Sequence, residues 1–290
     1  MEIFRQQTVP SSPDHADSMP TMVITSAGRL LPDFAELWRF RHLAGMFVWR
    51  NLKLRFKQTS LGLLWIILQP IAATGVFAIF FGALAAIPSG DVPYPIFVAV
   101  GLVVWQFFSR ALANATSSLV GMTGVLSKIY LPRLIVPLSS VLTDTVDFVI
   151  VFVLLLAVLA VGGYLPARAL IAAPVCIFLV IAAALSCALW TSACDVLFRD
   201  TRVIVGFVLQ FGLFFMPVIY PLDLVPSGWQ TLYLLNPLVP VISAFRWSLI
   251  ATAPPPPLWA FALAVATIGA VGFGGLLIFT RIERLMMDRI

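Results

Sequence analysis

The sequence predicts an all-α integral membrane protein with about six transmembrane helices. Of its 290 residues, 61% are hydrophobic and only 11% are charged. Soluble domains carry roughly 25% charged residues, and so few polar side chains could not cover a surface that faces water. Long apolar runs recur along the chain, and basic residues gather in every second connection between them. These observations together indicate a protein that crosses a bilayer several times.

The segment before the first span divides into two parts. Residues 1–33 are polar and Pro-containing, which predicts a flexible cytoplasmic tail and no cleavable signal peptide. Residues 34–57 are predicted to form an amphipathic helix that lies in the membrane interface. A basic linker that merely precedes the first span is the alternative. The basic face of the predicted helix carries Arg39, His42, Arg50, Lys53 and Lys57, with apolar and aromatic residues on the other side.

Spans are predicted wherever about 20 mostly apolar residues follow one another. Such runs lie near 61–87, 95–119, 138–163, 169–197, 203–221 and 258–280. The apolar segment 226–252 is interrupted by Pro and Gly residues, so it is predicted to form a re-entrant pair of short gate helices. Basic residues precede the first span and follow the second, fourth and sixth. The positive-inside rule therefore places both termini in the cytoplasm.

Several common kinds of site are not indicated. No G-x-x-x-x-G-K-[ST] motif occurs, so the chain is not expected to bind ATP through a P-loop. His15 and His42 are isolated, and no metal-ligand spacing exists. Cys176, Cys187 and Cys194 lie in or beside one apolar run, where packing is a better explanation than a disulfide framework. The predicted outward loops hold almost no polar cluster, which argues against a membrane-embedded transferase.

Two acidic residues inside the third predicted span are candidates for an intramembrane site. Asp144 and Asp147 are three residues apart and so share one helix face. Ionisable groups in a span are costly and are usually paired or functional. A polar clamp between helices, with Arg110 of the second span, is favoured over a proton relay. The relay would make the chain a proton-coupled secondary transporter, but no inverted repeat between its halves supports that alternative.

Aromatic side chains form a second candidate group. Flat rings can stack on the C–H faces of sugars, although rings also pack in cores and form interfacial belts. As a group beside the broken segment, they are candidates for a pore mouth. The aromatic residues in question are Trp105, Phe108, Phe211, Phe215, Tyr220, Trp229 and Tyr233.

Seven short stretches follow one another along the chain in a recognisable order. They are 50–65 with Pro70, Pro93-Tyr94-Pro95-Ile96-Phe97 with Gly101 and Trp105, Lys128-Ile129-Tyr130-Leu131-Pro132-Arg133, Phe198-Arg199-Asp200, Met216-Pro217-Val218-Ile219-Tyr220, Asn236-Pro237 and Ala244-Phe245-Arg246. Taken together, these stretches resemble the membrane subunit of bacterial polysaccharide exporters of the ABC transporter type-2 permease family. The resemblance covers roughly residues 34–290, and Asn51, Phe56 and Leu134 depart from residues usual in the family.

The resemblance implies a transport subunit and not an enzyme. It implies a homodimer in the bacterial inner membrane, paired with a separate cytoplasmic ATPase dimer that binds ATP and Mg²⁺, so this chain itself needs no cofactor. The substrate would be a lipid-linked polysaccharide, of O-antigen or capsular type, and nucleic acid is not an expected partner. Another lipid or a drug is the alternative cargo. The loop at 126–133 would dock on the ATPase through Lys128, Ile129, Tyr130, Pro132 and Arg133.

Four basic residues at the end of the predicted interface helix suggest where a substrate would arrive. Arg50, Lys53, Arg55 and Lys57 would meet a pyrophosphate-linked lipid head at the cytoplasmic face, where guanidinium groups clamp phosphate well. Attraction to anionic membrane lipids explains the same charges equally well.

Overall fold

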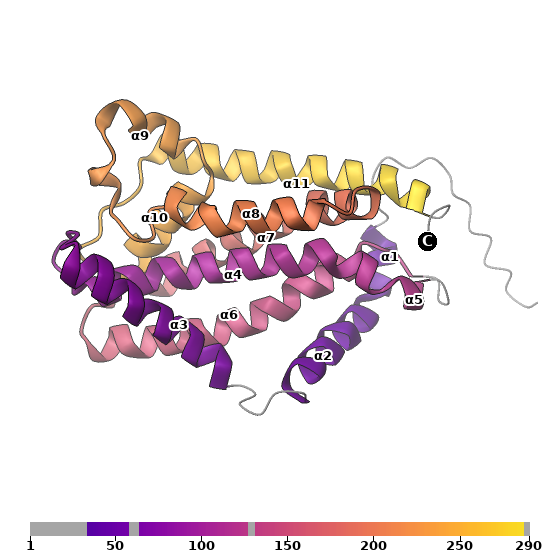
Figure 1. Ribbon diagram of the computed structural model, residues 1–290, viewed down its shortest axis with the longest axis horizontal. Coiled ribbons are helices and arrows are strands. Elements are labelled where there is room, and N and C mark those ends of the chain that lie inside the picture. The colour runs from indigo at the N-terminus through magenta and orange to yellow at the C-terminus, as the bar shows by residue number, and fades with distance from the viewer. Residues whose placement is uncertain (1–33, 58–63, 127–130, 287–290) are drawn as a thin grey trace, which may run out of the picture.

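A computed structural model describes residues 34–57, 64–126 and 131–286, and every regular element in these ranges is a helix. Within these described ranges, five helical spans are long and apolar enough to cross a bilayer, which confirms the predicted all-α membrane class. They run side by side as an elongated bundle (Figure 1). The spans are α3 with its π-helical continuation η1 (Leu64–Leu84), α4 (Tyr94–Gly121), α6 (Ile135–Val161), α7 (Ala169–Leu197) and α11 (Leu258–Met286).

The helix α4 is the axis of the bundle. In the most apolar 18-residue stretch of α4, 67% of the residues are buried, whereas the corresponding fractions are 11% for α3 with η1 and 17% for α11. Helices α3, α6, α7, α8 (Thr201–Gly212) and α10 (Leu238–Leu249) all pack against it. Since α3 and α11 are apolar yet largely uncovered, their outer faces are suited to lipid or to another protein.

Small residues bring α7 and α11 into close contact. The Trp190 indole donates a hydrogen bond to the Val271 carbonyl at 2.8 Å, and the Ser186 hydroxyl approaches the Ile268 carbonyl at 3.0 Å. A Cβ added at Gly275 would lie 3.0 Å from the Cβ of Leu189. Approach of this kind is typical of helix pairs in membranes, where polar groups and small residues replace the hydrophobic effect.

The predicted span at 203–221 is where the structure differs from the sequence prediction. The helix begins at Thr201 and, after one 3₁₀ turn η2 (Leu213–Phe215), the chain leaves helical geometry at Met216. Met216 is extended, with φ −119° and ψ 150°. Pro217 explains this, because proline disfavours helical geometry in the residue before it and cannot donate a backbone hydrogen bond. The fifth run is thus a short helix followed by irregular backbone.

The predicted gate segment holds two short helices beside that irregular backbone. A 3₁₀ turn η3 (Leu222–Leu224) leads into α9 (Ser227–Leu234), and α10 follows after Asn236 and Pro237. Both helices lie at the end of the bundle where α3 joins α4, opposite the end that holds α1 and the end of α11 (Figure 1).

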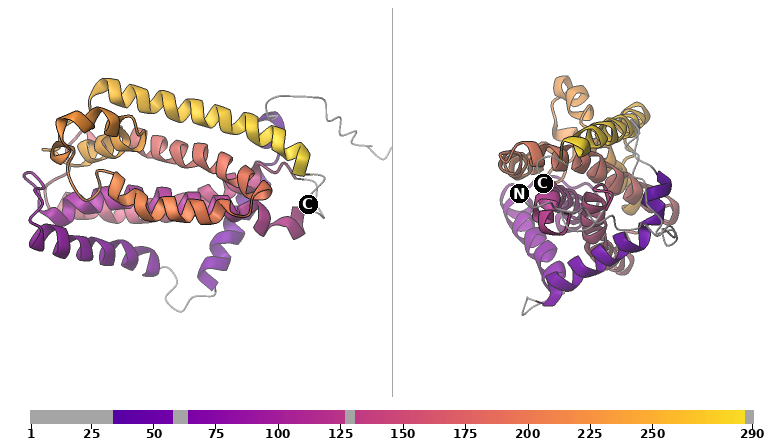
Figure 2. Two further views of the ribbon diagram at one scale, coloured as in Figure 1. Left: turned by 45° about the horizontal axis from the view of Figure 1, so that its top comes forward. Right: turned by 90° about the vertical axis from the view of Figure 1, so that its right-hand side faces the viewer.

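The predicted interface helix is divided in two, α1 (Phe34–Arg39) and α2 (Arg41–Lys57). Helix α2 lies obliquely across the outside of the bundle (Figure 2). Its Ala44 and Phe47 are buried in an apolar cluster with Ile135 of α6 and Phe279 of α11. The face of α2 turned away exposes Met46 and Trp49, and α1 exposes Trp38, aromatic and apolar side chains that suit a headgroup region.

Candidate functional site

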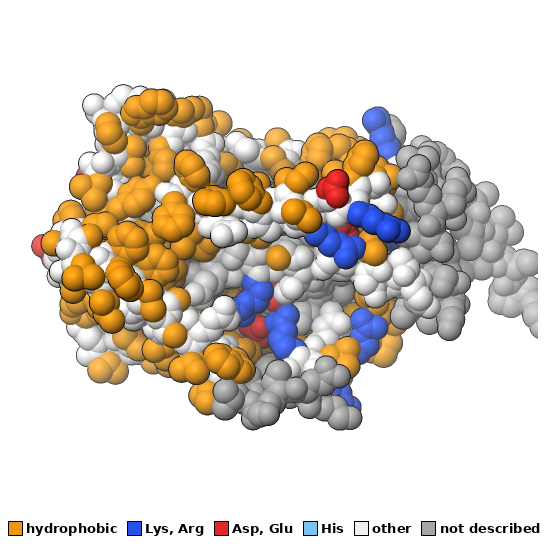
Figure 3. Space-filling view, viewed as in Figure 1, with side chains coloured by type: hydrophobic (Ala, Val, Ile, Leu, Met, Phe, Trp, Pro, Cys, Tyr) orange, Lys and Arg blue, Asp and Glu red, His pale blue; other side chains and the backbone are white. Residues whose placement is uncertain are grey.

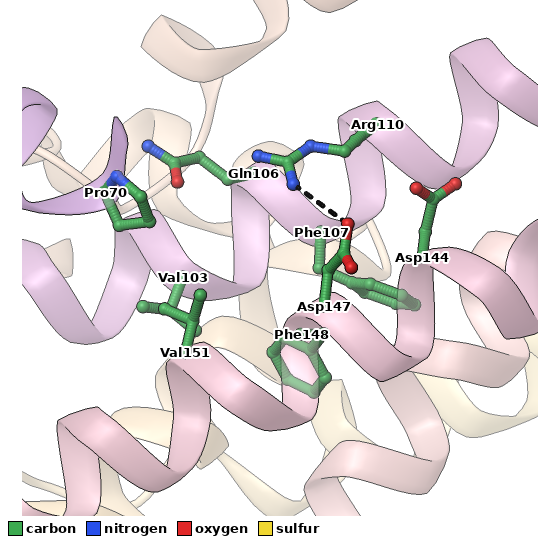
Figure 4. Close-up of a pocket in the computed structure, with 9 residues that line it drawn as sticks. All are labelled: Pro70, Val103, Gln106, Phe107, Arg110, Asp144, Asp147, Phe148 and Val151. Atoms are coloured by element: carbon green, nitrogen blue, oxygen red, sulfur yellow. Dashed lines mark ion pairs between the residues drawn. The ribbon is translucent and has the colours of Figure 1, made fainter. Parts of the chain in front are cut away.

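Charged residues that lie up to 92 positions apart in the sequence meet in and beside a hollow on the side of the bundle. In the space-filling view, basic and acidic side chains meet there, between a largely apolar left half and a right-hand end that carries further charges (Figure 3). The cavity is small, with a volume of about 20 Å³. Its lining comes from α3, α4 and α6 (Figure 4), and consists of Pro70, Val103, Gln106, Phe107, Arg110, Asp144, Asp147, Phe148 and Val151.

The two carboxylates of α6 are buried and share one guanidinium. Asp144 and Asp147 are each 2% exposed. Arg55 of α2 donates from Nη2 to Asp144 Oδ1 at 3.0 Å and from Nη1 to Asp147 Oδ2. Burial opposes the charge on Arg55, but the two carboxylates outweigh it and raise the pKa of the guanidinium above its ordinary value. Arg55 therefore stays charged and bridges two successive positions on one face of α6.

Helices α4 and α3 complete the cluster. Arg110 Nη1 lies 3.6 Å from Asp147 Oδ2, and the Asn114 amide donates to Asp144 Oδ1 and Oδ2 at 3.0 and 2.9 Å. Arg110 Nη2 also donates to Gln69 Oε1 of α3 at 3.1 Å. We call these six residues the charge cluster: Gln69, Arg110, Asn114, Asp144 and Asp147 together with Arg55. With two guanidinium groups and two carboxylates its formal charge is zero.

A second polar arrangement supports the irregular backbone after α8. Arg246 of α10 is 7% exposed and donates from Nη2 to the carbonyls of Pro217 and Val218 at 2.8 and 3.3 Å. Its guanidinium lies 3.7 Å from the ring centroid of Phe97, and the Tyr94 hydroxyl donates to the Ile219 carbonyl at 2.7 Å. Backbone that leaves a helix at membrane depth needs partners of this kind, because no water satisfies its carbonyls.

Known proteins identify the scaffold that carries these two arrangements. The family described as ABC-2 type transporter matches residues 43–250. The chain belongs to the ABC-2 type transporter family. It is similar to the O-antigen export system permease protein RfbA of Myxococcus xanthus, with 29% identity over 214 residues that cover 73% of this chain and 81% of the relative.

Two further relatives are more distant. An O-antigen export system permease protein RfbA of Klebsiella pneumoniae is 25% identical over 198 residues, or 68% of this chain and 76% of the relative. The polysialic acid transport protein KpsM of Escherichia coli is 23% identical over 198 residues, or 68% and 77%. The family resemblance inferred from the sequence is thereby confirmed.

The four basic residues predicted to receive a phosphate have different surroundings in this ABC-2 transporter. Arg55 is bound in the charge cluster, and Lys53 is exposed. Arg50 is half-buried: its guanidinium lies 5.0 Å from the Phe47 ring centroid and donates to Met122 Sδ at 3.5 Å. The side chain of Lys57 lies outside the described residues. Of this group, Lys53 is the one described side chain that is exposed.

The predicted docking loop is only partly described. Lys128, Ile129 and Tyr130 lie outside the described residues, and the preceding helix α5 spans Thr123–Leu126. After Pro132, the Arg133 backbone N–H donates to Glu283 Oε1 of α11 at 3.1 Å, and Arg133 Nη1 donates to the Glu283 carbonyl at 3.3 Å. The end of this loop is therefore fastened to the last helix of the bundle.

The predicted pore aromatics separate into three groups: two core residues, a hydrogen-bonded pair of tyrosines and three exposed residues. Trp105 and Phe108 are each 6% exposed and lie in the core, where a Cβ on Gly212 of α8 would come within 2.6 Å of the Trp105 ring. The ring hydroxyl of Tyr233 lies 3.2 Å from that of Tyr220, which donates to the Phe214 carbonyl at 2.8 Å. The exposed members of the group are Phe211, Phe215 and Trp229.

Two buried charged residues are missing from the site residues that the sequence predicts. Arg246 enters the sequence analysis only within the stretch Ala244-Phe245-Arg246, although one arginine in the apolar run Leu238–Leu249 is itself a signal for a buried partner. Asp195 of α7 is 1% exposed and accepts two bonds from Arg202 Nε, at 2.8 and 3.0 Å. An aspartate inside the run 169–197 carried the same signal.

Proposed function

We propose that this chain is the permease subunit of an ATP-driven exporter that moves lipid-linked polysaccharide, of O-antigen or capsular type, across the bacterial inner membrane. The observation that carries the proposal is the similarity, over more than two thirds of the chain, to permeases named for O-antigen export and to a polysialic acid transport protein. The sequence has no P-loop motif, so ATP and Mg²⁺ would be bound by a separate ATPase subunit.

The surface around the hollow supports a homodimer as the working unit. Helices α3 and α8 expose apolar side chains such as Trp65 and Phe207, while α4 between them carries the partly exposed polar residues Gln106, Ser109 and Asn114. A polar stripe inside a span is costly in lipid and favourable against water or a polar ligand. Two copies that pair through α3 and α8 would enclose these stripes in one path, with Phe211 and Phe215 along its wall.

Both termini would lie in the cytoplasm, where the loop at 126–133 and α2 would meet the ATPase dimer. Helix α2 lies obliquely across the bundle, and Arg133 connects the loop to α11. A push on either element would therefore reach the long helices directly.

The function is tested by deleting the gene in its own host and purifying the tagged chain from it. We expect the deletion to remove surface polysaccharide and to leave polymer on its lipid carrier inside the cell, and we expect a Walker-motif ATPase to co-purify with the chain. Normal surface polysaccharide in the deletion strain, or export by the purified chain driven by a pH gradient without ATP, would contradict the proposal.

Replacing two lysines of α2 should weaken recognition of the phosphate-bearing lipid head. Each charge-assisted hydrogen bond to phosphate contributes about 1.5–3 kcal/mol, so Lys53→Gln/Lys57→Gln should lower export about tenfold or more at matched protein level. Arg41→Gln is the control, because it removes one charge from the same helix at an exposed position next to Trp38. If the loss persists in vesicles of neutral lipid, attraction to anionic lipid is not its cause. Unchanged export would remove these lysines from the substrate path.

A further inference from the structure

We infer that the charge cluster is a mechanical joint, in which Arg55 locks the end of α2 to α6 so that the two helices move as one body. Arg55, Asp144 and Asp147 are then positioning residues for export: they touch no substrate, and they convert a push on α2 into a movement of the spans. The inference rests on the proposed function, because the joint matters only if a partner acts on α2.

Its position suits a joint. Near its beginning α2 is held by apolar packing of Ala44 and Phe47. Near its end, Arg55 reaches a face of α6 that is 89 positions away in sequence. Two attachments of different kinds, at opposite ends of one helix, fix both its place and its direction. Figure 4 shows the two carboxylates of α6 turned towards α4, on whose side Arg110 lies.

Its electrostatics favour fastening over ligand binding. Counted over the side chains alone, Asp144 and Asp147 are 1% and 3% exposed, and the side chains of Arg55 and Arg110 that cover them are 33% and 27% exposed. Because the positive and negative charges are equal in number, the cluster offers little net attraction to a phosphate. Withdrawing Arg55 would instead leave two like charges buried near each other, which a low-dielectric interior strongly disfavours. The joint should therefore stay closed while the helices move.

The cluster also extends the connection beyond α6. Asn114 holds Asp144 to α4, and Arg110 links Asp147 to Gln69 of α3. Helix α3 is the least buried of the spans in the described part of the chain, so a polar link has a larger share in its position than it would for a core helix. A displacement of α2 thus reaches α6 and α4 directly and α3 through Arg110.

The test compares export with ATP hydrolysis in proteoliposomes that contain the permease and its co-purified ATPase. In Arg55→Gln we expect the amount of polymer exported per ATP to fall about tenfold, because two charge-assisted hydrogen bonds to Asp144 and Asp147 are lost. The ATPase should stay bound and hydrolyse ATP at about the wild-type rate. Asp147→Asn should behave alike, and Arg55→Lys should recover part of the coupling. Arg41→Gln, the control on the same helix, should match the wild type.

A neutral double variant separates the joint from a purely structural role. Arg55→Gln/Asp144→Asn leaves one guanidinium and one carboxylate, so its melting temperature should recover relative to Arg55→Gln while the coupling stays lost. Wild-type coupling in Arg55→Gln or in the double variant would overturn the inference, and so would a loss of export that only follows the amount of folded protein. If the wild-type complex itself exports no polymer with ATP, the proposed function is wrong instead.

Discussion

Replacing Gly101 with valine is expected to destabilise the protein by about 3 kcal/mol, the upper part of the range for overpacking a dense core. A Cβ at this position of α4 would lie 3.0 Å from Arg246 Nη2 and 3.1 Å from the Cα of Val218. The second neighbour is backbone and cannot rotate away, so α4 must separate from the segment after α8. Thermal unfolding in detergent, followed by size-exclusion chromatography, should show a melting temperature lower by about 10 °C.

Gly269→Val is the matched control, because a Cβ at this glycine of α11 meets nothing within 4 Å. It should melt within about 2 °C of the wild type, since only the helix propensity of one residue changes. Gly101→Ala should fall between the two. Equal melting temperatures for the two valine variants would show that the close approach of α4 and Val218 is not needed.

Replacing Arg246 with methionine is expected to lower stability by about 2–4 kcal/mol, because the Pro217 and Val218 carbonyls lose their donor inside the bundle. The loss is partly offset, since a buried guanidinium that has no carboxylate within 4 Å in the described chain is itself costly to desolvate. The same melting experiment measures the change. An increase in melting temperature would mean that the desolvation cost outweighs the carbonyl bonds.

Arg246→Lys and Tyr94→Phe resolve the contributions. Lysine keeps the charge but presents one compact ammonium group in place of the planar fork, so we expect an intermediate loss. Tyr94→Phe removes only the bond to the Ile219 carbonyl and should cost about 1 kcal/mol. If Arg246→Lys is as stable as the wild type, charge and not geometry supports the irregular segment.

The long helices were predictable because a bilayer imposes a simple rule on sequence. Twenty consecutive apolar residues have few alternatives to a spanning helix, and α4, α6, α7 and α11 follow that rule. The fifth run, 203–221, is apolar enough to follow this rule but contains Pro217. Because proline disfavours helical geometry in the residue before it, the helix ends several residues before the apolar run ends.

The contacts of the candidate site were not predictable to the same degree. The sequence indicates that Asp144 and Asp147 need a cationic partner and suggests Arg110, which lies 3.6 Å from Asp147, but it does not indicate that Arg55 of α2 reaches the same face of α6. Arg55 was assigned to phosphate on the same grounds as Lys53, since both lie in one basic run. Only the oblique path of α2 gives the two side chains different surroundings, and tertiary packing sets that path. Likewise, Trp105 and Phe211 are alike as sequence, and one is core while the other is exposed.

The short helix Thr201–Phe215 has a consequence for the surrounding lipid. At 1.5 Å per residue it covers roughly 22 Å, about 8 Å less than a hydrocarbon layer of ordinary thickness. A bilayer meets such a mismatch by thinning locally, at a modest cost per ångström. Where α8 faces lipid, we therefore expect the bilayer beside it to be thinner than the bilayer beside the long helix α11. The proposed pairing of two copies through α8 would cover this short helix with protein and so remove the mismatch.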